Sequence, residues 1–134
     1  MRTTRSNPDT VAPPIGAYSH AVRVETEDAI WIHVSGQIAN DPDGTLVSPG
    51  DLPAQTERVF ENVASILEAN GATFADVVKI QSFFTTFDGL HESREVRARY
   101  LPSEPPASTA VRVVALVVPD AVLEVDVVAV VPRP

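Results

Sequence analysis

The chain has 134 residues, which is enough for one domain with a sizeable buried core. It contains no cysteine, which excludes a disulfide framework, a thiol nucleophile and a zinc–thiolate site. The net charge of −8 disfavours a general nucleic-acid binder, because such proteins need a clustered cationic surface. The sequence has neither an apolar signal-peptide segment nor an apolar run of membrane length, so we expect a cytoplasmic protein without a membrane partner.

The N-terminal part is expected to form a lead-in followed by a β-hairpin. Residues 1–14 are mostly polar and end in two prolines, which indicates an extended or mobile segment. Residues 18–25 and 29–36 have alternating apolar positions on either side of a short acidic turn, as the strands of a hairpin do. A turn at residues 40–44 then precedes Leu46-Val47, where we expect a short strand.

A helix is predicted between Asp51 and Asn70. Asp51 suits the N-cap, Pro53 suits the first turn, and Asn70-Gly71 is a typical stop signal. Between these signals, apolar residues recur at helical spacing, at Val59, Phe60, Val63, Ile66 and Leu67.

The C-terminal half predicts a strand, a second helix and two further strands. Residues 76–87 are rich in β-branched and aromatic side chains, which favours a strand. Residues 90–101 have a weaker apolar face at helical spacing. Residues 109–117 and 122–131 are nearly continuous in valine, as in strands that are covered on both faces.

The order ββ(β)αβαββ predicts a single α+β domain over residues 1–134, with one mixed sheet and two helices on one face. Helices on one side leave the other face of the sheet bare, although the last strands are apolar on both faces. An apolar face of this kind needs a partner, and a second copy of the chain can supply it. We therefore expect a homo-oligomer.

Several stretches together resemble one family. The stretches "APPIGAYSHAV", "VSGQIAND", "QTERVFENVASILEANGATFADVVKIQSFFT", "PPASTAVRVVAL" and "LEVDVVAV" are similar to the reactive-intermediate deaminase (Rid) family, also called YjgF-like or endoribonuclease L-PSP. The resemblance implies a chorismate-mutase-like fold, a homotrimer, and small-molecule pockets at the subunit interfaces. Well-known members hydrolyse 2-imino acids or enamines to 2-oxo acids and ammonia without metal or cofactor. Other members are linked to ribonuclease activity or translation inhibition.

The resemblance also implies a pocket with one altered residue. In deaminating members an arginine of a "PAR-S" motif grips the substrate carboxylate, and Ser108 occupies that position here. A hydroxyl makes one neutral hydrogen bond where a guanidinium makes two charge-assisted ones, so ordinary 2-imino acids are disfavoured as substrates. Ala110, in the same stretch, is expected to line the pocket. Glu124 matches the glutamate that positions or activates water; the alternative is a surface or interface ion pair.

Three further residues match positions that line the family's pocket. Tyr18 would stack on a planar imine or donate a hydrogen bond, and its alternative role is packing alone. Ser35 and Gly36 match a turn whose backbone amides face the ligand, although glycine there is also explained by structure alone. Gln37 and Gln55 are expected to be polar links that brace the architecture.

A cation could replace the missing arginine. Arg94 falls where deaminating members place a pocket asparagine, and Arg112 lies on the same strand face as Ser108 if no bulge intervenes. The alternative for both is a solvated arginine paired with a nearby glutamate. None of the histidines, His20, His33 and His91, has the spacing of a metal site, so no metal is expected.

We therefore expect a trimeric protein that binds a small metabolite at its subunit interfaces and hydrolyses an imine, an enamine or a related C–N bond. In this hypothesis Glu124 orients water and the Ser35–Gly36 amides polarise the substrate. A neutral or amide-bearing substrate fits Ser108 best. The alternatives are a ligand-binding or regulatory trimer without turnover and, less favoured because of the acidic charge, an endoribonuclease or translation inhibitor.

Overall fold

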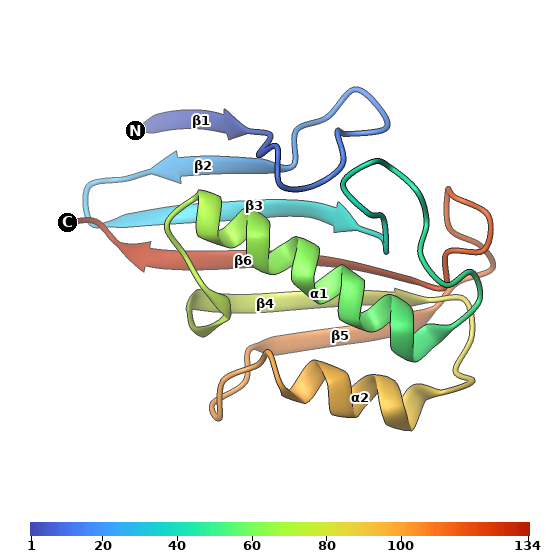
Figure 1. Ribbon diagram of the computed structural model, residues 1–134. Coiled ribbons are helices and arrows are strands. Elements are labelled where there is room, and N and C mark those ends of the chain that lie inside the picture. The colour runs from blue at the N-terminus through green and yellow to red at the C-terminus, as the bar shows by residue number, and fades with distance from the viewer.

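A computed structural model describes all 134 residues and consists of one six-stranded mixed sheet with two helices on one of its faces (Figure 1). The strand order is β1-β2-β3-β6-β4-β5, and only the β4–β5 pair is parallel. The chain forms, in order, β1 Arg2–Ser6, β2 Ala21–Glu25, β3 Ala29–Gln37, α1 Leu52–Ala69, the short 3₁₀ helix η1 Phe74–Asp76, β4 Val77–Phe84, α2 Leu90–Ala98, β5 Ala107–Arg112 and β6 Leu123–Pro132. The predicted α+β class is confirmed.

The long helix α1 begins and ends where its local signals predict. The Asp51 carboxylate accepts a hydrogen bond from the Ala54 amide at 3.2 Å, which caps the first turn. At the other end Gly71 has φ of +80°, a conformation that glycine adopts without strain. The buried face of α1 packs mainly against β6 and β3, so this helix covers the centre of the sheet.

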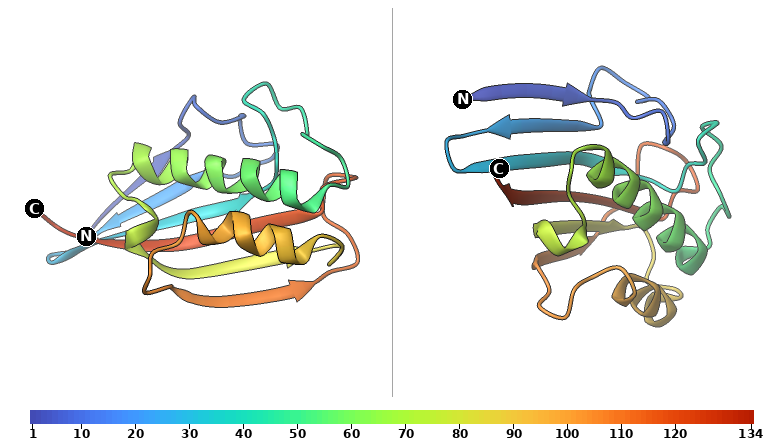
Figure 2. Two further views of the ribbon diagram at one scale, coloured as in Figure 1. Left: turned by 60° about the horizontal axis from the view of Figure 1, so that its bottom comes forward. Right: turned by 60° about the vertical axis from the view of Figure 1, so that its left-hand side comes forward.

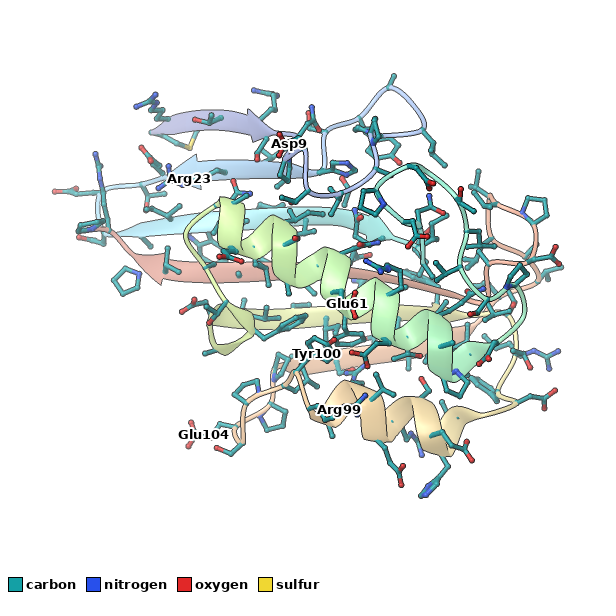
Figure 3. All side chains as sticks on the ribbon, in the orientation of Figure 1. Asp9, Arg23, Glu61, Arg99, Tyr100 and Glu104 are labelled. Atoms are coloured by element: carbon teal, nitrogen blue, oxygen red, sulfur yellow. The ribbon has the colours of Figure 1, made fainter.

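The shorter helix α2 covers the β5 side of the same face and is tied to α1 by polar and aromatic contacts (Figure 2). The buried hydroxyls of Thr56 and Ser93 lie 2.6 Å apart between the two helices. Tyr100, just after α2, packs its ring against Phe60 with the centroids 5.4 Å apart and the planes tilted by 42°, and its hydroxyl donates a hydrogen bond of 2.6 Å to Glu57 (Figure 3). The segment that leads from α2 into β5 is therefore anchored on α1.

The face of the sheet opposite the helices carries no covering element (Figure 2). In β6, buried residues alternate with partly exposed ones, and every residue of β5 is exposed. Trp31 and Val111 each remain 41% exposed, and both lie on strands at positions that face away from the helices. The bare face inferred from the sequence is therefore present in the isolated chain.

Several predicted elements have other boundaries in the structure, and the strand predicted over residues 76–87 ends at Phe84. Leu46-Val47 is not a strand, because Leu46 makes only an isolated bridge to Asn40. The second helix ends at Ala98 instead of Leu101, because Pro102 disfavours helical geometry in the residue before it. The fifth strand ends at Arg112 instead of Val117, because its partner β4 ends at Phe84, opposite Arg112.

The lead-in, expected as extended or mobile, contributes a strand that was not predicted. Residues 2–6 form β1 and pair antiparallel with β2 at the edge of the sheet. Farther along, Val11 and Ala12 are buried against the domain. None of the helices is long and apolar enough to cross a membrane.

Gln55 is a buried polar link, as the sequence predicted. Its side-chain nitrogen donates to the carbonyls of Ser48 at 3.2 Å and Asp120 at 2.9 Å, and its oxygen accepts from the Val122 amide at 2.9 Å. The side chain is fully buried in α1 and joins the loop before that helix to the segment that enters β6. One buried side chain thus satisfies three backbone groups, of which the Val122 amide is buried.

Replacing Gln55 by leucine is expected to lower the free energy of unfolding by roughly 1–3 kcal/mol, because the buried Val122 amide loses its partner and the links to the Ser48 and Asp120 carbonyls are lost. Urea denaturation measures the change. Glu68→Leu is the matched control, since Glu68 lies on the exposed side of the same helix. Equal losses in the two variants would contradict the role of Gln55.

Candidate functional site

Two places on the chain contain the residues predicted to carry function. The first is a β-bulge in β3. Val34 pairs with Val127 and Gln37 with Val125, so that Ser35 and Gly36 together oppose the single residue Asp126. The extra residue bends β3 at the point where β6 begins.

Glu124 packs its carboxylate directly on Gly36 of this bulge. A Cβ atom placed on Gly36 would lie 2.5 Å from Glu124 Oε2 and 2.8 Å from its Cδ, which is closer than real Cβ contacts allow. The absence of a side chain at Gly36 makes room for the carboxylate, and a side chain there would displace it. Glu124 lies on the sheet face that the helices leave uncovered.

The surroundings of Glu124 favour its protonated form. Burial raises the pKa of Glu124, and the negative charge of Asp126 raises it further. Burial also raises the pKa of Asp126, while the Lys79 charge acts in the opposite direction. Lys79 itself donates a hydrogen bond of 2.8 Å to Thr109. A raised pKa brings a carboxyl closer to the operating pH of a general acid or base.

Ser35 and Tyr18 use their polar groups within the chain. The Ser35 amide donates to the His20 carbonyl at 2.8 Å, and the Ser35 hydroxyl donates to the Ser19 carbonyl at 2.6 Å. The Tyr18 hydroxyl accepts from the Ile15 amide at 3.3 Å. Of the two amides expected to polarise a substrate, the Ser35 amide is therefore already engaged.

Tyr18 and Gly36 line a cavity of about 30 Å³ beneath the loop that precedes β2. This volume holds one water molecule rather than a metabolite. His20 also borders the cavity, is buried, and lies with Nε2 2.6 Å from the Ala12 carbonyl oxygen. This part of the chain therefore serves as a support for β3 and does not form a ligand pocket by itself.

The second place is a pocket of about 440 Å³ between α2 and β5. It brings together three residues that the sequence singled out, Arg94, Ser108 and Ala110. Its other lining residues are Phe84, Phe87, Leu90, Ser93 and Arg97. The size falls in the range of small-molecule sites.

Arg97 also lines this pocket and was not among the predicted residues. Its Nη1 donates to the Ser82 hydroxyl at 3.0 Å and its Nη2 to the Ser108 hydroxyl at 2.9 Å. Burial lowers the pKa of Arg97, and the nearby charge of Arg94 lowers it further, although an arginine stays protonated in proteins. Its spacing of three residues from Arg94 on the helix was the sequence signal that could have revealed it.

Arg94 and Arg112, the two cations predicted to replace the missing arginine, make no hydrogen bond to the Ser108 hydroxyl. Arg94 is exposed at the pocket, and Arg112 donates from Nε to the Thr85 carbonyl at 3.4 Å, beyond the end of β4. His91 is exposed and lies 3.2 Å from Glu95 on α2. No three histidine, aspartate or glutamate side chains gather as a metal site would require.

The two places lie on opposite faces of the sheet. Ser108 pairs with Ile80, which is fully buried beneath the helices, whereas Glu124 pairs with Phe83 on the other side. Because side chains alternate along a strand, these two residues point away from each other. One chain alone therefore does not bring Glu124 to the pocket that contains Ser108.

Comparison with known proteins finds one matching family model, relatives of similar sequence and solved structures of similar fold. The family model described as endoribonuclease L-PSP matches residues 9–131. A RutC family protein of Pyrococcus abyssi is 39% identical over 100 residues, which are 75% of this chain and 76% of that protein. RidA from an Antarctic Psychrobacter species has a TM-score of 0.84 at 31% identity, over 96% of this chain and 99% of that one. E. coli TdcF with bound serine has a TM-score of 0.79 at 25% identity, over 98% of this chain and 99% of that one.

Gly36→Ala is expected to displace the Glu124 carboxylate and to destabilise the protein by up to about 1 kcal/mol, because the new methyl group meets the flexible end of that side chain. In a Glu124→Ala background the same change should cost much less, since the atoms it meets are gone. A double-mutant cycle by urea denaturation measures this coupling. Identical costs in the two backgrounds would contradict the contact.

The raised pKa of Glu124 gives the protein a defined pH dependence. A carboxyl that binds its proton more tightly when folded makes unfolding harder as pH falls from above the raised pKa toward the ordinary value of 4.5. Glu124→Gln should therefore gain more stability relative to wild type at about pH 7 than at about pH 4.

Asp43→Asn is the control for this measurement, because the hydrogen bond from the Thr45 amide lowers the pKa of Asp43. Ionised Asp43 favours the folded state, so removing its charge should give no gain near neutral pH. A gain in stability near neutral pH in Asp43→Asn, or no such gain in Glu124→Gln, would contradict the raised pKa of Glu124.

Proposed function

Because the chain belongs to the endoribonuclease L-PSP family, which includes the Rid proteins, we propose that it binds a small metabolite and hydrolyses an imine, an enamine or a related C–N bond. The observation that carries this proposal is the Glu124 carboxyl, held against Gly36 with a raised pKa. The RidA structure and the TdcF structure with bound serine support a small nitrogen-containing ligand.

The proposed reaction requires only water and one proton-transfer group. Water adds its oxygen to the imine carbon, and Glu124 takes a proton from that water and passes it to the nitrogen. The resulting amino alcohol then collapses, so that the C–N bond breaks, a carbonyl forms and ammonia leaves. No oxidant or reductant is consumed. Glu124 suits the role because burial and the nearby charge of Asp126 raise its pKa, so that its carboxyl holds a proton more readily than an ordinary glutamate.

The proposal also requires a homotrimer. Glu124 and the pocket between α2 and β5 face opposite sides of one chain, so a complete site needs the uncovered face of one subunit to lie near the pocket of another. The exposed strand β5 and the exposed side chains of Trp31 and Val111 support such an association, because apolar surface of this kind is normally covered.

A ligand-binding trimer without turnover is the second candidate function. It is favoured by the separation of Glu124 from the pocket between α2 and β5, since that pocket can bind a ligand without any contribution from Glu124. The endoribonuclease activity in the family's name is the least favoured, because a net charge of −8 disfavours contacts to nucleic-acid phosphates.

Ammonia release separates the first two functions. The substrate is 2-aminoacrylate or a branched-chain imino acid formed in the assay, and the protein should accelerate its hydrolysis above the spontaneous rate. Glu124→Gln should lower that acceleration by about a hundredfold or more, as expected for loss of an acid–base group. Light scattering on the same samples reports whether the assembly is intact.

Asp126→Asn is the matched control, because Asp126 lies two residues along the same strand on the same face and also has a raised pKa. It should retain most of the acceleration. No acceleration by the wild-type protein would favour the binding function, and equal losses in the two variants would remove Glu124 from its proposed role.

A further inference from the structure

We infer that the pocket between α2 and β5 is an anion site in which Arg97 is the specificity-determining residue. Its ligand is a small organic anion that has a planar carboxylate at one end and an apolar group at the other. The inference names the ligand class of the proposed function. It rests on that function only in assuming that this pocket is where the ligand binds. It also replaces the neutral substrate that Ser108 alone suggested.

The charge of Arg97 lacks a counter-charge within the chain. Arg23, Arg58 and Arg99 each form an ion pair with a carboxylate, whereas Arg97 contacts only the hydroxyls of Ser82 and Ser108. Arg97 is partly buried, and Arg94 adds a second positive charge that no carboxylate pairs with. A desolvated cation without a partner favours a bound anion, and it does so here in a chain of net charge −8.

The two serines fix the orientation of the guanidinium. A guanidinium has five N–H donors in one plane, and Ser82 and Ser108 accept one from each terminal nitrogen. Three donors remain for a ligand, and a carboxylate can accept two parallel bonds from such a fork. Ser82 is fully buried in β4, so its hydroxyl is a rigid anchor.

Ser108 is accordingly a positioning residue that acts through Arg97. Its hydroxyl holds Nη2 at 2.9 Å, on the strand position where the sequence comparison expected a substrate contact. The cation reaches the pocket from helix α2, and the strand supplies the hydroxyl that orients it.

Half of the residues that line the pocket are apolar. The rings of Phe84 and Phe87 lie 5.6 Å apart, and Leu90 and Ala110 complete this part of the lining. A volume of about 440 Å³ accommodates a ligand with a few heavy atoms beyond its carboxylate. The pocket thus combines one charged end with an aromatic wall, which suits an amphipathic organic acid better than inorganic phosphate.

Benzoate and benzamide test the inference, because they share shape and differ in charge. Calorimetric titration of the wild-type protein should give a benzoate affinity at least about tenfold higher than that of benzamide. Arg97→Gln should reduce the preference to less than about threefold, with benzamide binding little changed. Ser108→Ala should weaken benzoate binding and leave benzamide binding unchanged, because it removes only the orientation of the guanidinium.

Arg99→Gln is the matched control. It removes the same charge two residues farther along, from a side chain that bonds Glu57 outside the pocket, and should keep the full preference (Figure 3). Circular dichroism and a urea midpoint verify folding. If Arg97→Gln does not fold, Arg97→Lys provides the test, since it keeps the charge but cannot bond both serines and should lose part of the preference.

Three results would overturn the inference: equal binding of the two probes to the wild-type protein, a preserved preference in Arg97→Gln, or an equal loss in Arg99→Gln. No benzoate binding up to roughly ten millimolar would also overturn it. The titration needs no turnover and does not involve Glu124. A failed ammonia assay with intact benzoate selectivity would therefore reject hydrolysis alone, and the reverse result would reject only the anion site.

Discussion

Two helices cover only one face of a six-stranded sheet, and this one-sided covering determines the rest of the structure. On the helix side, α1 and α2 bury one set of alternating strand residues in a single core. On the other side, the alternate residues of the same strands remain at the surface. Each strand therefore has one set of side chains in the core and one set on the uncovered face. A shift of one residue in register would move each set to the other face.

The two candidate functional groups lie on different faces of the sheet. The proton-transfer group Glu124 lies on the uncovered side, where a bulge and a glycine make room for it. The cation Arg97 lies on the helix side, where two hydroxyls from neighbouring strands orient it. Within one chain the sheet separates the two groups, so the Glu124 carboxylate and the Arg97 guanidinium of the same subunit do not pair.

The sequence predicted well whatever depends on local signals. Asp51, Pro53 and Gly71 delimit α1 because caps and stop signals act within a few residues. The predicted end of β5 was wrong because that end depends on where its partner β4 stops. The predicted strand at Leu46-Val47 was wrong because Leu46 finds only an isolated bridge partner, Asn40. Arg97 was missed because its partners, Ser82 and Ser108, come from strands that only the tertiary structure brings together.

The position of Trp31 has a spectroscopic consequence. It is the only tryptophan of the chain, and it lies half-exposed on the uncovered face of β3. Indole emission shifts to shorter wavelength when water leaves its surroundings, so the intrinsic fluorescence reports on this one face and on no other part of the chain. The protein thus contains a natural optical label for whatever covers its sheet.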